Sequence, residues 1–390
     1  MSWPMVKLGE LFKVTSGGTP SRQKSEYYDG GEIHWVKTGD LHNKYVESAT
    51  EFITQAGLKG SSTRLYPKGT VLVAMYGATI GACSILNVEA CTNQACAAFV
   101  PNKNVDIDFL YYLLKYCKPD FVKAGSGGAQ PNISSTFLKD YKIPFPPLAE
   151  QKCIAAILDK ADAIRRKRKQ AIQLADDFLR AVFLDMFGDP VTNPKGFPIG
   201  TIRDFVDTAN YGSSGKASET EGEFPILRMG NITYEGGWNF SSLKYIDLSD
   251  KDKPKYLAQK GDLLFNRTNS KELVGKTAVF EEDIPMAIAG YLVRVRPNQL
   301  GNNYYLSGYL NSAHGKKTLV GMCKSIVGMA NINAQELQNI EIMLPPKKLQ
   351  DDFESIVKIT NQKLKSFNAS EVLLSDSFNS LSQKAFAGEL

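Results

Sequence analysis

The chain has few of the residues that build metal centres and hydrolytic triads. Among its 390 residues there are three histidines, His34, His42 and His314, and six cysteines with no C-x-x-C pair. Zinc sites and redox motifs need such residues at short, fixed spacings, and nucleophilic hydrolases need a histidine base beside the nucleophile. We therefore expect reduced thiols, no metal centre, and no serine or cysteine hydrolase activity.

Long apolar runs that could enter a membrane are also missing. The first residues, MSWPMVKLGELF, lack a basic segment followed by an apolar core, so we expect no signal peptide. Residues 69–88 hold no charge, but Gly77 and Gly81 interrupt them, and the pattern favours strand, glycine turn and strand over a membrane span. The net charge of +5 permits an anionic partner without requiring one. These features predict a cytoplasmic protein with no membrane partner.

Motifs for nucleotide and methyl-donor binding do not stand out either. Residues 275–277 read GKT, like the end of a phosphate-binding loop, but Ser270 occupies the position of that motif's first glycine. No NPPY-like tetrapeptide and no glycine fingerprint for S-adenosylmethionine is evident, which argues against a methyltransferase. Asp120, Asp140 and Lys142 have the spacing of a nuclease metal site. A nuclease that uses these three residues is therefore the enzymatic alternative.

The sequence does contain an internal repeat. Residues 35–41 (WVKTGDL) match 226–232 (ILRMGNI), residues 68–73 (KGTVLV) match 260–265 (KGDLLF), and residues 143–151 (IPFPPLAEQ) match 342–350 (IMLPPKKLQ). Seven such matches follow one another in the same order along the whole chain, which chance does not readily produce. The sequence therefore predicts a duplicated protein in which each half is a globular module followed by a helix.

Within each module, short runs of β-branched and aromatic residues lie between Gly, Asn and Asp turns. This pattern predicts strands within residues 70–75, 96–100, 262–265 and 291–295, and apolar periodicity predicts helices over 106–115 and 304–312. The mixture predicts an α+β fold. We expect the first module over residues 1–145, its helix over 146–190, the second module over 191–343, and its helix over 344–390.

Two long helices are expected after the repeated proline pairs, because about 40 residues without Pro or Gly follow each pair. Apolar residues recur there every three or four positions, which predicts a coiled-coil seam. The expected seam residues are Ile154, Ile157, Ile164, Ile172, Leu179 and Val182 in the first helix and Phe353, Val357, Leu364, Phe367, Leu374, Phe378 and Leu381 in the second. Each helix would be roughly 60 Å long at ~1.5 Å per residue. We expect them to pair antiparallel, with the modules related by a pseudo-twofold axis.

Two similar but non-identical modules separated by rods suit a linear partner that has a repeat of its own. Duplex DNA repeats every ~34 Å, and dimeric DNA-binding proteins place their two recognition elements one helical turn apart on one face of the duplex. Because the two modules differ in sequence, they would read two different half-sites rather than a palindrome.

Three motifs carry a resemblance to a known family. Residues 129–134 (AQPNIS) precede 143–151 and a long helix, residues 265–270 (FNRTNS) precede 273–276 (LVGK), and the chain ends in QKAFAGEL at 383–390. In this combination the chain resembles the DNA specificity subunit of type I restriction–modification enzymes, over its whole length. One departure lies in the second proline motif, where Leu349 stands in place of Glu150.

The resemblance implies that each module is a target recognition domain reading one half of an asymmetric, bipartite site in double-stranded DNA. It also implies two methylation subunits, which carry S-adenosylmethionine and methylate adenine at N6, and restriction subunits, which use ATP and Mg to translocate and cut DNA. The chain itself would be non-catalytic and hold no cofactor. A coiled-coil adaptor without DNA affinity is the structural alternative.

Base reading needs side chains with paired donors or acceptors, such as Arg for guanine and Asn for adenine. In the second module we expect DNA contacts from a polar turn and its neighbours: Asn266, Arg267, Thr268, Asn269, Ser270, Lys271, Lys276, Arg228 and Asn231. In the first module the expected contacts are Lys37, Asp40, Tyr76 and Thr79, with Lys123 and Gln130 around a glycine-rich loop. The most basic run, RRKRK at 165–169, is by default a solvated helix face, and a contact with a partner subunit or with DNA phosphates remains open as an alternative.

Overall fold

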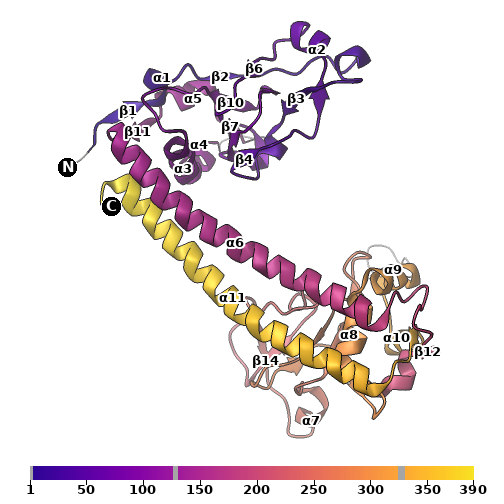
Figure 1. Cartoon of the computed structure of the whole chain (residues 1–390). Helices are drawn as coiled ribbons and strands as arrows, with labels where there is room; N and C mark the ends of the chain where they lie inside the picture. The colour runs from indigo at the N-terminus through magenta and orange to yellow at the C-terminus, as the bar shows by residue number, and fades with distance from the viewer. Residues whose placement is uncertain (1–2, 126–130, 324–329) are drawn as a thin grey trace. The chain divides into compact units, whose positions relative to one another are not determined.

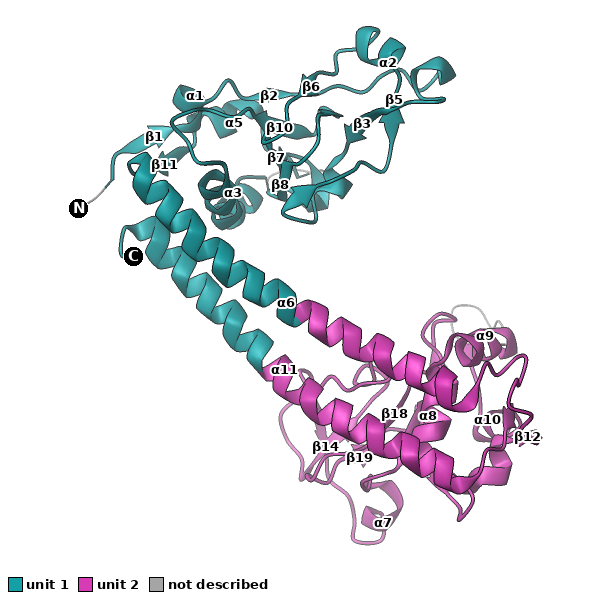
Figure 2. Ribbon diagram, in the orientation of Figure 1, with its two compact units in different colours: residues 1–168, 370–390 teal, residues 169–369 magenta. Residues whose placement is uncertain are grey.

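The computed structural model describes residues 3–125, 131–323 and 330–390. The chain forms two compact units, the first made of Met1–Arg168 and Ser370–Leu390 and the second of Lys169–Ala369 (Figure 2). Each unit therefore contains one globular module and a part of both long helices (Figure 1). The border between the units crosses both helices.

Among its described residues, the first unit contains three sheets. In the two-stranded sheet, β1 (Met5–Lys7) pairs with β11 (Lys142–Pro144). The five-stranded sheet has the order β2 (Thr15–Ser16), β10 (Cys96–Phe99), β7 (Val71–Ala74), β8 (Cys83–Leu86), β4 (Tyr45–Val46). The four-stranded sheet has the order β5 (Phe52–Ile53), β3 (Ile33–Val36), β9 (Ala90–Thr92), β6 (Leu65–Tyr66). Its shorter helices are α1 (Leu8–Leu11), α2 (Gln55–Lys59), α3 (Ile107–Tyr116), α4 (Lys118–Gly125) and α5 (Ser135–Asp140), with 3₁₀ turns at η1 (Ser25–Tyr27), η2 (Thr38–Asp40) and η3 (Gly77–Thr79).

The second unit contains a similar, but not identical, set of elements in its described residues. β12 (Ile199–Thr201) pairs with β22 (Glu341–Met343), and the four-stranded sheet has the order β13 (Val206–Tyr211), β20 (Leu292–Pro297), β16 (Leu263–Asn266), β18 (Thr277–Val279). A three-stranded sheet has the order β15 (Lys244–Ile246), β14 (Phe224–Leu227), β19 (Ala287–Ile288), and β17 (Thr268–Asn269) pairs with β21 (Ala330–Asn331). Its shorter helices are η4 (Ile202–Phe205), α7 (Lys253–Tyr256), α8 (Asn303–Asn311), α9 (Ala313–Met322) and α10 (Ala334–Gln338).

The topology confirms the internal repeat. The order β2-β10-β7-β8 in the first unit corresponds to β13-β20-β16-β18 in the second. The β3–β9 pair is parallel, and so is its counterpart β14–β19. All six strands and helices expected within the modules are present, with boundaries that differ by one or two residues. Both halves are thus mixed α and β modules of one design.

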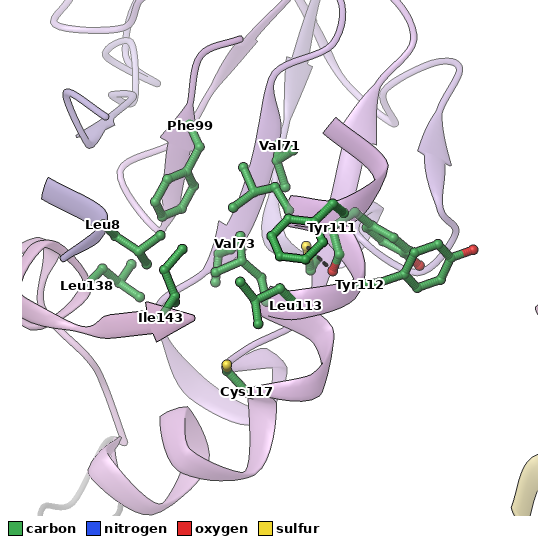
Figure 3. Close-up of a cluster of buried hydrophobic side chains, with 14 of the residues drawn as sticks. Leu8, Val71, Val73, Phe99, Tyr111, Tyr112, Leu113, Cys117, Leu138 and Ile143 are labelled. Carbon is green, nitrogen blue, oxygen red and sulfur yellow. Dashed lines mark hydrogen bonds between the residues drawn. The ribbon is translucent and has the colours of Figure 1, made fainter. Parts of the chain in front are cut away.

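The main core of the first unit lies between its central strands and α3 (Figure 3). Val71 and Val73 of β7 pack into the same cluster as Tyr111 and Leu113 of α3. The alternate residues, such as Leu72, join a second cluster on the other face of the strand. Since successive side chains of a strand point to opposite faces, β7 is buried on both sides, which explains its uninterrupted apolar sequence.

Residues 69–88 form strand, turn and strand, as the glycines predicted. They contain β7, η3 and β8, and β7 pairs antiparallel with β8. Throughout the described parts of the chain, every helix is either too short or too polar to cross a membrane.

The repeated Pro-Pro motif fastens each long helix to its module through a buried glutamine. Gln151 donates from Nε2 to the carbonyl of Pro146 at 2.9 Å, and Gln350 does the same to Pro345 at 2.9 Å. Gln151 also accepts the backbone N–H of Asp106 at 2.9 Å, and the Asp106 side chain caps α3. The glutamine therefore joins three segments: the proline turn, the long helix and the loop that begins the module's own helix.

The replacement of Glu150 by Leu349 in the second copy of the repeat is accompanied by a second replacement, of Trp3 by Phe197. In the first unit Trp3 donates from Nε1 to the Glu150 carboxylate at 2.8 Å. The aligned residues in the second unit, Phe197 and Leu349, are both partly buried against the apolar core. A polar pair in one copy is thus replaced by two apolar residues in the other.

The two long helices, α6 (Leu148–Phe187) and α11 (Lys347–Ala387), contact each other within each unit (Figure 2). In the first unit, Leu158 from the early part of α6 shares a core with Phe378 and Phe386 from the late part of α11. In the second unit, Phe183 from the end of α6 meets Phe353 from the start of α11, with ring centroids 5.6 Å apart.

Two expected seam positions in α6 are wrong. Ile157 and Ile164 are 37 % and 48 % exposed, whereas Ile154, Ala155 and Leu158 are buried. The reason is that this part of α6 packs against α3 of the module as well as α11, so that its buried face is turned by about one residue. The other expected seam residues are buried or half-buried: Ile154, Ile172, Leu179, Val182, Phe353, Val357, Leu364, Phe367, Leu374, Phe378 and Leu381.

Candidate nucleic-acid interface

A polar loop follows the buried strand β16 in the second unit. Its base is closed by two backbone hydrogen bonds, from the Asn266 N–H to the Lys276 carbonyl at 2.9 Å and from the Gly275 N–H to the Asn266 carbonyl at 2.8 Å. Gly275 has a φ of +81°, and a Cβ there would lie 2.7 Å from a methyl carbon of Leu319. Only glycine fits this position without strain, so the loop has a defined base from which residues 267–271 project.

A short strand that arrives from elsewhere in the unit holds the first part of this loop. The Ile332 N–H donates to the Arg267 carbonyl at 2.9 Å, and Thr268 pairs with Asn331 between β17 and β21. The first unit repeats the arrangement, because the Ile133 N–H donates to the Met75 carbonyl at 2.9 Å. The Asn-Ile step found in both copies of the repeat therefore fixes the loop after the central strand.

The Arg267 side chain in this loop is held by Tyr211 and Asn331. Its guanidinium carbon lies 4.6 Å from the centroid of the Tyr211 ring, and its Nε donates to Asn331 Oδ1 at 3.3 Å. Its backbone N–H donates to the Tyr291 carbonyl at 3.1 Å. The Tyr211 hydroxyl in turn accepts the N–H of Ala334 at 3.1 Å. A half-exposed cation is thus stacked on an aromatic ring at the surface of the module.

Three expected base contacts in this unit are wrong, because their side chains are buried and serve the fold. Asn231 is 3 % exposed, accepts the Arg228 N–H at 2.8 Å and donates to the Asn239 carbonyl at 2.9 Å. Asn266 has no exposed surface. Thr268 is largely buried and shares Asn331 Oδ1 with Arg267.

Lys276 is also directed inward, which corrects its expected role. Its ammonium donates to the Ile232 carbonyl, and burial lowers its pKa. Arg228 is half-buried and donates from Nη2 to the Ser242 carbonyl at 3.0 Å. Lys271 is exposed, and Asn269 and Ser270 are half-exposed. Together with Arg267, these last three residues form the accessible polar edge of the loop.

In the first unit the loop after β7 exposes an aromatic side chain. Tyr76 is exposed, its carbonyl accepts the Thr79 hydroxyl at 3.0 Å, and its backbone forms a bridge to Asn132. Lys123 is exposed near the end of α4. Gln130 lies outside the described residues. Tyr76, Thr79 and Lys123 therefore remain candidates for contact with DNA.

The two other expected contacts of the first unit have internal partners. Asp40 is 6 % exposed and accepts the backbone N–H groups of Lys37 at 2.8 Å and Thr50 at 3.3 Å, so it is a turn cap, and its expected contact with DNA is wrong. Lys37 pairs with Glu51, and this hydrogen bond lowers the pKa of the Glu51 carboxyl. Arg22 shares the same carboxylate.

A buried lysine joins the first module to α6. The Lys44 ammonium bonds to Asp108 at 2.7 Å and to Asp159, which also accepts the Tyr112 hydroxyl at 2.8 Å. Burial alone would lower the pKa of Lys44, but the hydrogen bonds to both carboxylates outweigh it and raise the pKa. The ammonium therefore stays charged, and its network fixes the module on this part of the helix.

Part of the basic run at 165–169 also serves the first unit itself. Arg165 and Arg166 both pair with the buried Asp162. The Arg165 guanidinium carbon lies 4.5 Å from the centroid of the Phe378 ring of α11. Two of the five basic residues thus neutralise a buried carboxylate, a role that the sequence alone did not indicate.

The two carboxylates of the nuclease alternative, Asp140 and Asp120, have other partners. Asp140 pairs with Lys7 at 2.8 Å, which lowers the pKa of its carboxyl, and Asp120 accepts the Tyr141 hydroxyl at 2.6 Å. No group of three or more His, Cys, Asp or Glu side chains able to hold a metal ion is found within 3–125, 131–323 and 330–390.

Two residues that support the loop of the second unit, Tyr211 and Asn331, were not predicted from the sequence. Tyr211 lies at the end of a strand far from Arg267 in sequence, and no local pattern connects them. Asn331 could have been found, because it aligns with Asn132 in the repeat and both pair with the loop after a central strand.

The comparisons with known proteins agree with this duplicated architecture. The family model described as the type I restriction modification DNA specificity domain matches residues 2–174 and again residues 194–370. The MjaIX specificity subunit of Methanocaldococcus jannaschii is 25% identical over 412 residues, covering 100% of this chain and 93% of that protein. The EcoKI specificity subunit of Escherichia coli K12 is 21% identical over 414 residues, covering 100% of this chain and 89% of that protein.

Solved structures show the same fold. The S subunit of a type I restriction–modification system from M. genitalium aligns with a TM-score of 0.61 at 17% identity, covering 98% of this chain and 96% of that one. A chain from a study of complex assembly and conformational transition in a type I R-M system aligns with a TM-score of 0.56 at 18% identity, covering 100% and 98%. Because the family model matches both halves and most of the chain, this protein belongs to the type I restriction–modification DNA specificity family.

Proposed function

We propose that this chain is the sequence-specific DNA-recognition subunit of a type I restriction–modification complex. Each module is a target recognition domain that reads one half of an asymmetric, bipartite site in double-stranded DNA. The observation that carries the proposal is the repeated loop after the central strand. Both copies have the same backbone support, yet they expose different side chains, chiefly Tyr76 in one and Arg267 with Lys271 in the other.

Different side chains on the same support predict different half-sites. Since base edges in the major groove are read by the donors and acceptors of individual side chains, a phenol and a guanidinium select different bases. The two recognition domains would span residues 1–145 and 191–343, and the helical segments 146–190 and 344–390 would connect them.

The long helices would set the spacing between the half-sites. α6 has 40 residues and α11 has 41. At ~1.5 Å per residue each rod is roughly 60 Å long, more than one ~34 Å turn of duplex DNA. In this proposal α6 and α11 form an antiparallel coiled coil, the two recognition domains are related by a pseudo-twofold axis, and the base pairs between the half-sites are not read.

The same helices would dock the partner subunits. In the second unit, a shallow groove of about 400 Å³ runs between them, lined by apolar residues that include Phe178, Ile359 and Phe367. Phe178 and Ile359 are exposed, as are Val372 and Leu373 in the first unit. Exposed apolar stripes of this kind suit a helical partner. Two methylation subunits would bind there and carry S-adenosylmethionine, and restriction subunits would add ATP- and Mg-dependent cutting.

The chain would take no part in the chemistry itself. The two carboxylates of the nuclease alternative, Asp140 and Asp120, are engaged with Lys7 and Tyr141. We therefore assign methylation and cleavage to the partner subunits, and we assign this chain the reading of DNA and the placement of its partners.

The test is to express the full chain with its methylation subunit and to map methylated adenines by long-read sequencing of the host genome. A split, asymmetric motif with a fixed gap between its halves supports the proposal. A continuous motif would mean that one module is idle. A stable complex that leaves no methylation and shows no salt-dependent binding to duplex DNA would instead identify the chain as an adaptor without DNA affinity, because binding through phosphate contacts weakens as salt rises.

A further inference from the structure

Arg267 is held in one orientation before any ligand arrives. It stacks on the Tyr211 ring, with 4.6 Å from its guanidinium carbon to the ring centroid, and its Nε donates to Asn331 at 3.3 Å. Tyr211 is itself fixed, because its backbone pairs with Val293 and its hydroxyl accepts the Ala334 N–H. Arginine side chains normally lose considerable rotamer freedom on binding. Here three elements, β13, β21 and the loop after β16, have already removed much of that freedom.

In this orientation the two terminal nitrogens of the Arg267 guanidinium are available to an external ligand. Nε is engaged with Asn331, so the two terminal nitrogens form the outward fork. Within the described residues no carboxylate pairs with Arg267, in contrast to Arg165, which pairs with the buried Asp162. The cation therefore keeps both its charge and its planar donors for an external ligand.

A fixed planar fork suits a base edge better than a phosphate. Guanine presents two acceptors, O6 and N7, side by side in the major groove, and the terminal nitrogens of arginine match them with two parallel hydrogen bonds. A phosphate can also accept an arginine fork, but its tetrahedral oxygens can be approached from several directions, so a contact that only positions the protein does not require a guanidinium plane fixed in advance. The support given by Tyr211 and Asn331 is therefore what a base-reading arginine requires.

The equivalent position of the first unit cannot do this. The Ile133 N–H binds the Met75 carbonyl as the Ile332 N–H binds the Arg267 carbonyl, so that Met75 is the structural counterpart of Arg267. Met75 is 3 % exposed and its side chain has no donor. Among the described residues, the position of the first unit that corresponds to Arg267 therefore offers no guanidinium to a base.

We infer that Arg267, oriented by Tyr211 and Asn331, reads a guanine in the half-site bound by the second recognition domain. The inference rests on the proposed function and adds to it the identity of one base. Tyr211 and Asn331 are positioning residues, which act through Arg267 and do not touch the base. The first recognition domain reads no guanine from the corresponding position.

The experiment uses the full chain in complex with its methylation subunit. The wild-type motif is mapped first, and methylation is then measured on a plasmid library that carries every base substitution at each position of that motif. Arg267→Ala should relax a single G·C position in one half-site, lowering the preference for that pair by roughly tenfold to hundredfold, the range of one bidentate base contact. The other half-site is the internal control for folding and assembly.

Lys271→Ala is the matched control, because Lys271 is an exposed cation in the same loop. Loss of a phosphate contact there should weaken methylation of all sequences alike and reduce the salt slope of DNA binding by about one, without relaxing any base position. A salt titration on the wild-type duplex measures this difference.

Variants of Tyr211 test the positioning role. Tyr211→Leu removes the ring and should relax the same G·C position as Arg267→Ala. Tyr211→Phe keeps the ring and should restore most of the preference. A purely structural role would lower the thermal stability of the Leu variant and leave its base preference as in the wild type, which would overturn the assignment of Tyr211.

The outcomes separate the inference from the function on which it rests. A split wild-type motif in which Arg267→Ala relaxes an A·T position, or weakens all sequences equally, overturns the guanine assignment alone. A wild-type complex that yields no split motif overturns the proposed function and the inference with it.

Discussion

The buried glutamine of the repeated Pro-Pro motif should contribute more to stability in the first unit than in the second. Gln151 makes three hydrogen bonds: it donates to the carbonyls of Pro146 and Asn104, and it accepts the N–H of Asp106. Gln151→Leu keeps the approximate volume but leaves the Asp106 N–H and both carbonyls without this partner. A buried polar group left without a partner costs about 1–3 kcal/mol, and a carbonyl that keeps a second lone pair lies at the low end. We therefore expect Gln151→Leu to lower the local free energy of unfolding of the first unit by about 3 kcal/mol.

Gln350→Leu is the matched change in the second unit. Gln350 donates to the carbonyls of Pro345 and Leu300, but in the described structure its Oε1 is buried without a hydrogen-bond partner. The leucine removes this unsatisfied oxygen, which offsets part of the loss. We therefore expect Gln350→Leu to lower the local free energy of unfolding of the second unit by about 1 kcal/mol, so that the effects of the two substitutions differ by about 2 kcal/mol.

Hydrogen–deuterium exchange gives the local measurement that this comparison needs, because a chain with two units does not unfold in a single two-state step. Peptides covering α3 (Ile107–Tyr116) report the first unit, and peptides covering α8 (Asn303–Asn311) report the second. A loss of about 3 kcal/mol raises the opening equilibrium of α3 by roughly a hundredfold, at ~1.4 kcal/mol per factor of ten. Equal effects on α3 and α8, or a change at α3 below about 0.5 kcal/mol, would show that the hydrogen bonds of Gln151 do not fasten the helix.

Two further pairs of variants test the loop base and the corrected helix face. Gly275→Ala should lower the free energy of unfolding by about 2–4 kcal/mol, because the new Cβ would both strain the positive φ and clash with Leu319. Gly261 has a φ of +87° and no atom within 4 Å of the position that a Cβ would take, so Gly261→Ala should cost only the ~1 kcal/mol of the strained backbone. Equal shifts in the thermal melting temperature would contradict the role of Leu319. Leu158→Ala should cost about 2–5 kcal/mol and Ile157→Ala less than about 1 kcal/mol in denaturant unfolding, since only the first side chain is fully buried, and the opposite order would restore the seam inferred from the sequence.

Local patterns predicted much of the fold. The strand at Val71–Ala74 and the helix at Ile107–Tyr116 follow from runs of apolar residues with clear turn or cap signals, such as the Asp106 cap. The repeat was visible because the Pro-Pro turn, the buried glutamine and the Asn-Ile step each have a backbone role that restricts which residues fit. Features fixed by neighbouring residues in the chain are those that a single sequence reveals.

The polar residues of the candidate interface were harder to predict. Asp40, Asn231 and Asn266 have the residue types of base readers, but buried backbone N–H groups and carbonyls need partners too, and turns take them from the same residue types. Which polar residue caps a turn and which faces solvent depends on contacts between distant segments. The stacking of Arg267 on Tyr211 is of this kind, and only the structure reveals it.

The two copies differ where they would read DNA and agree where they hold the reading loop. The hydrogen bonds from Ile133 and Ile332, and the positive φ of Gly81 and Gly275 at the end of each loop, are the same in both units. Between these fixed points the first copy exposes Tyr76, the residue after Met75, and the second exposes Arg267, the counterpart of Met75. A backbone frame that tolerates such differences allows the base preference of a half-site to change without altering the core, because the exposed side chains project from a loop that backbone hydrogen bonds hold. Arg267 is then a replaceable part of the second module, and Tyr211 and Asn331 would have to change with it.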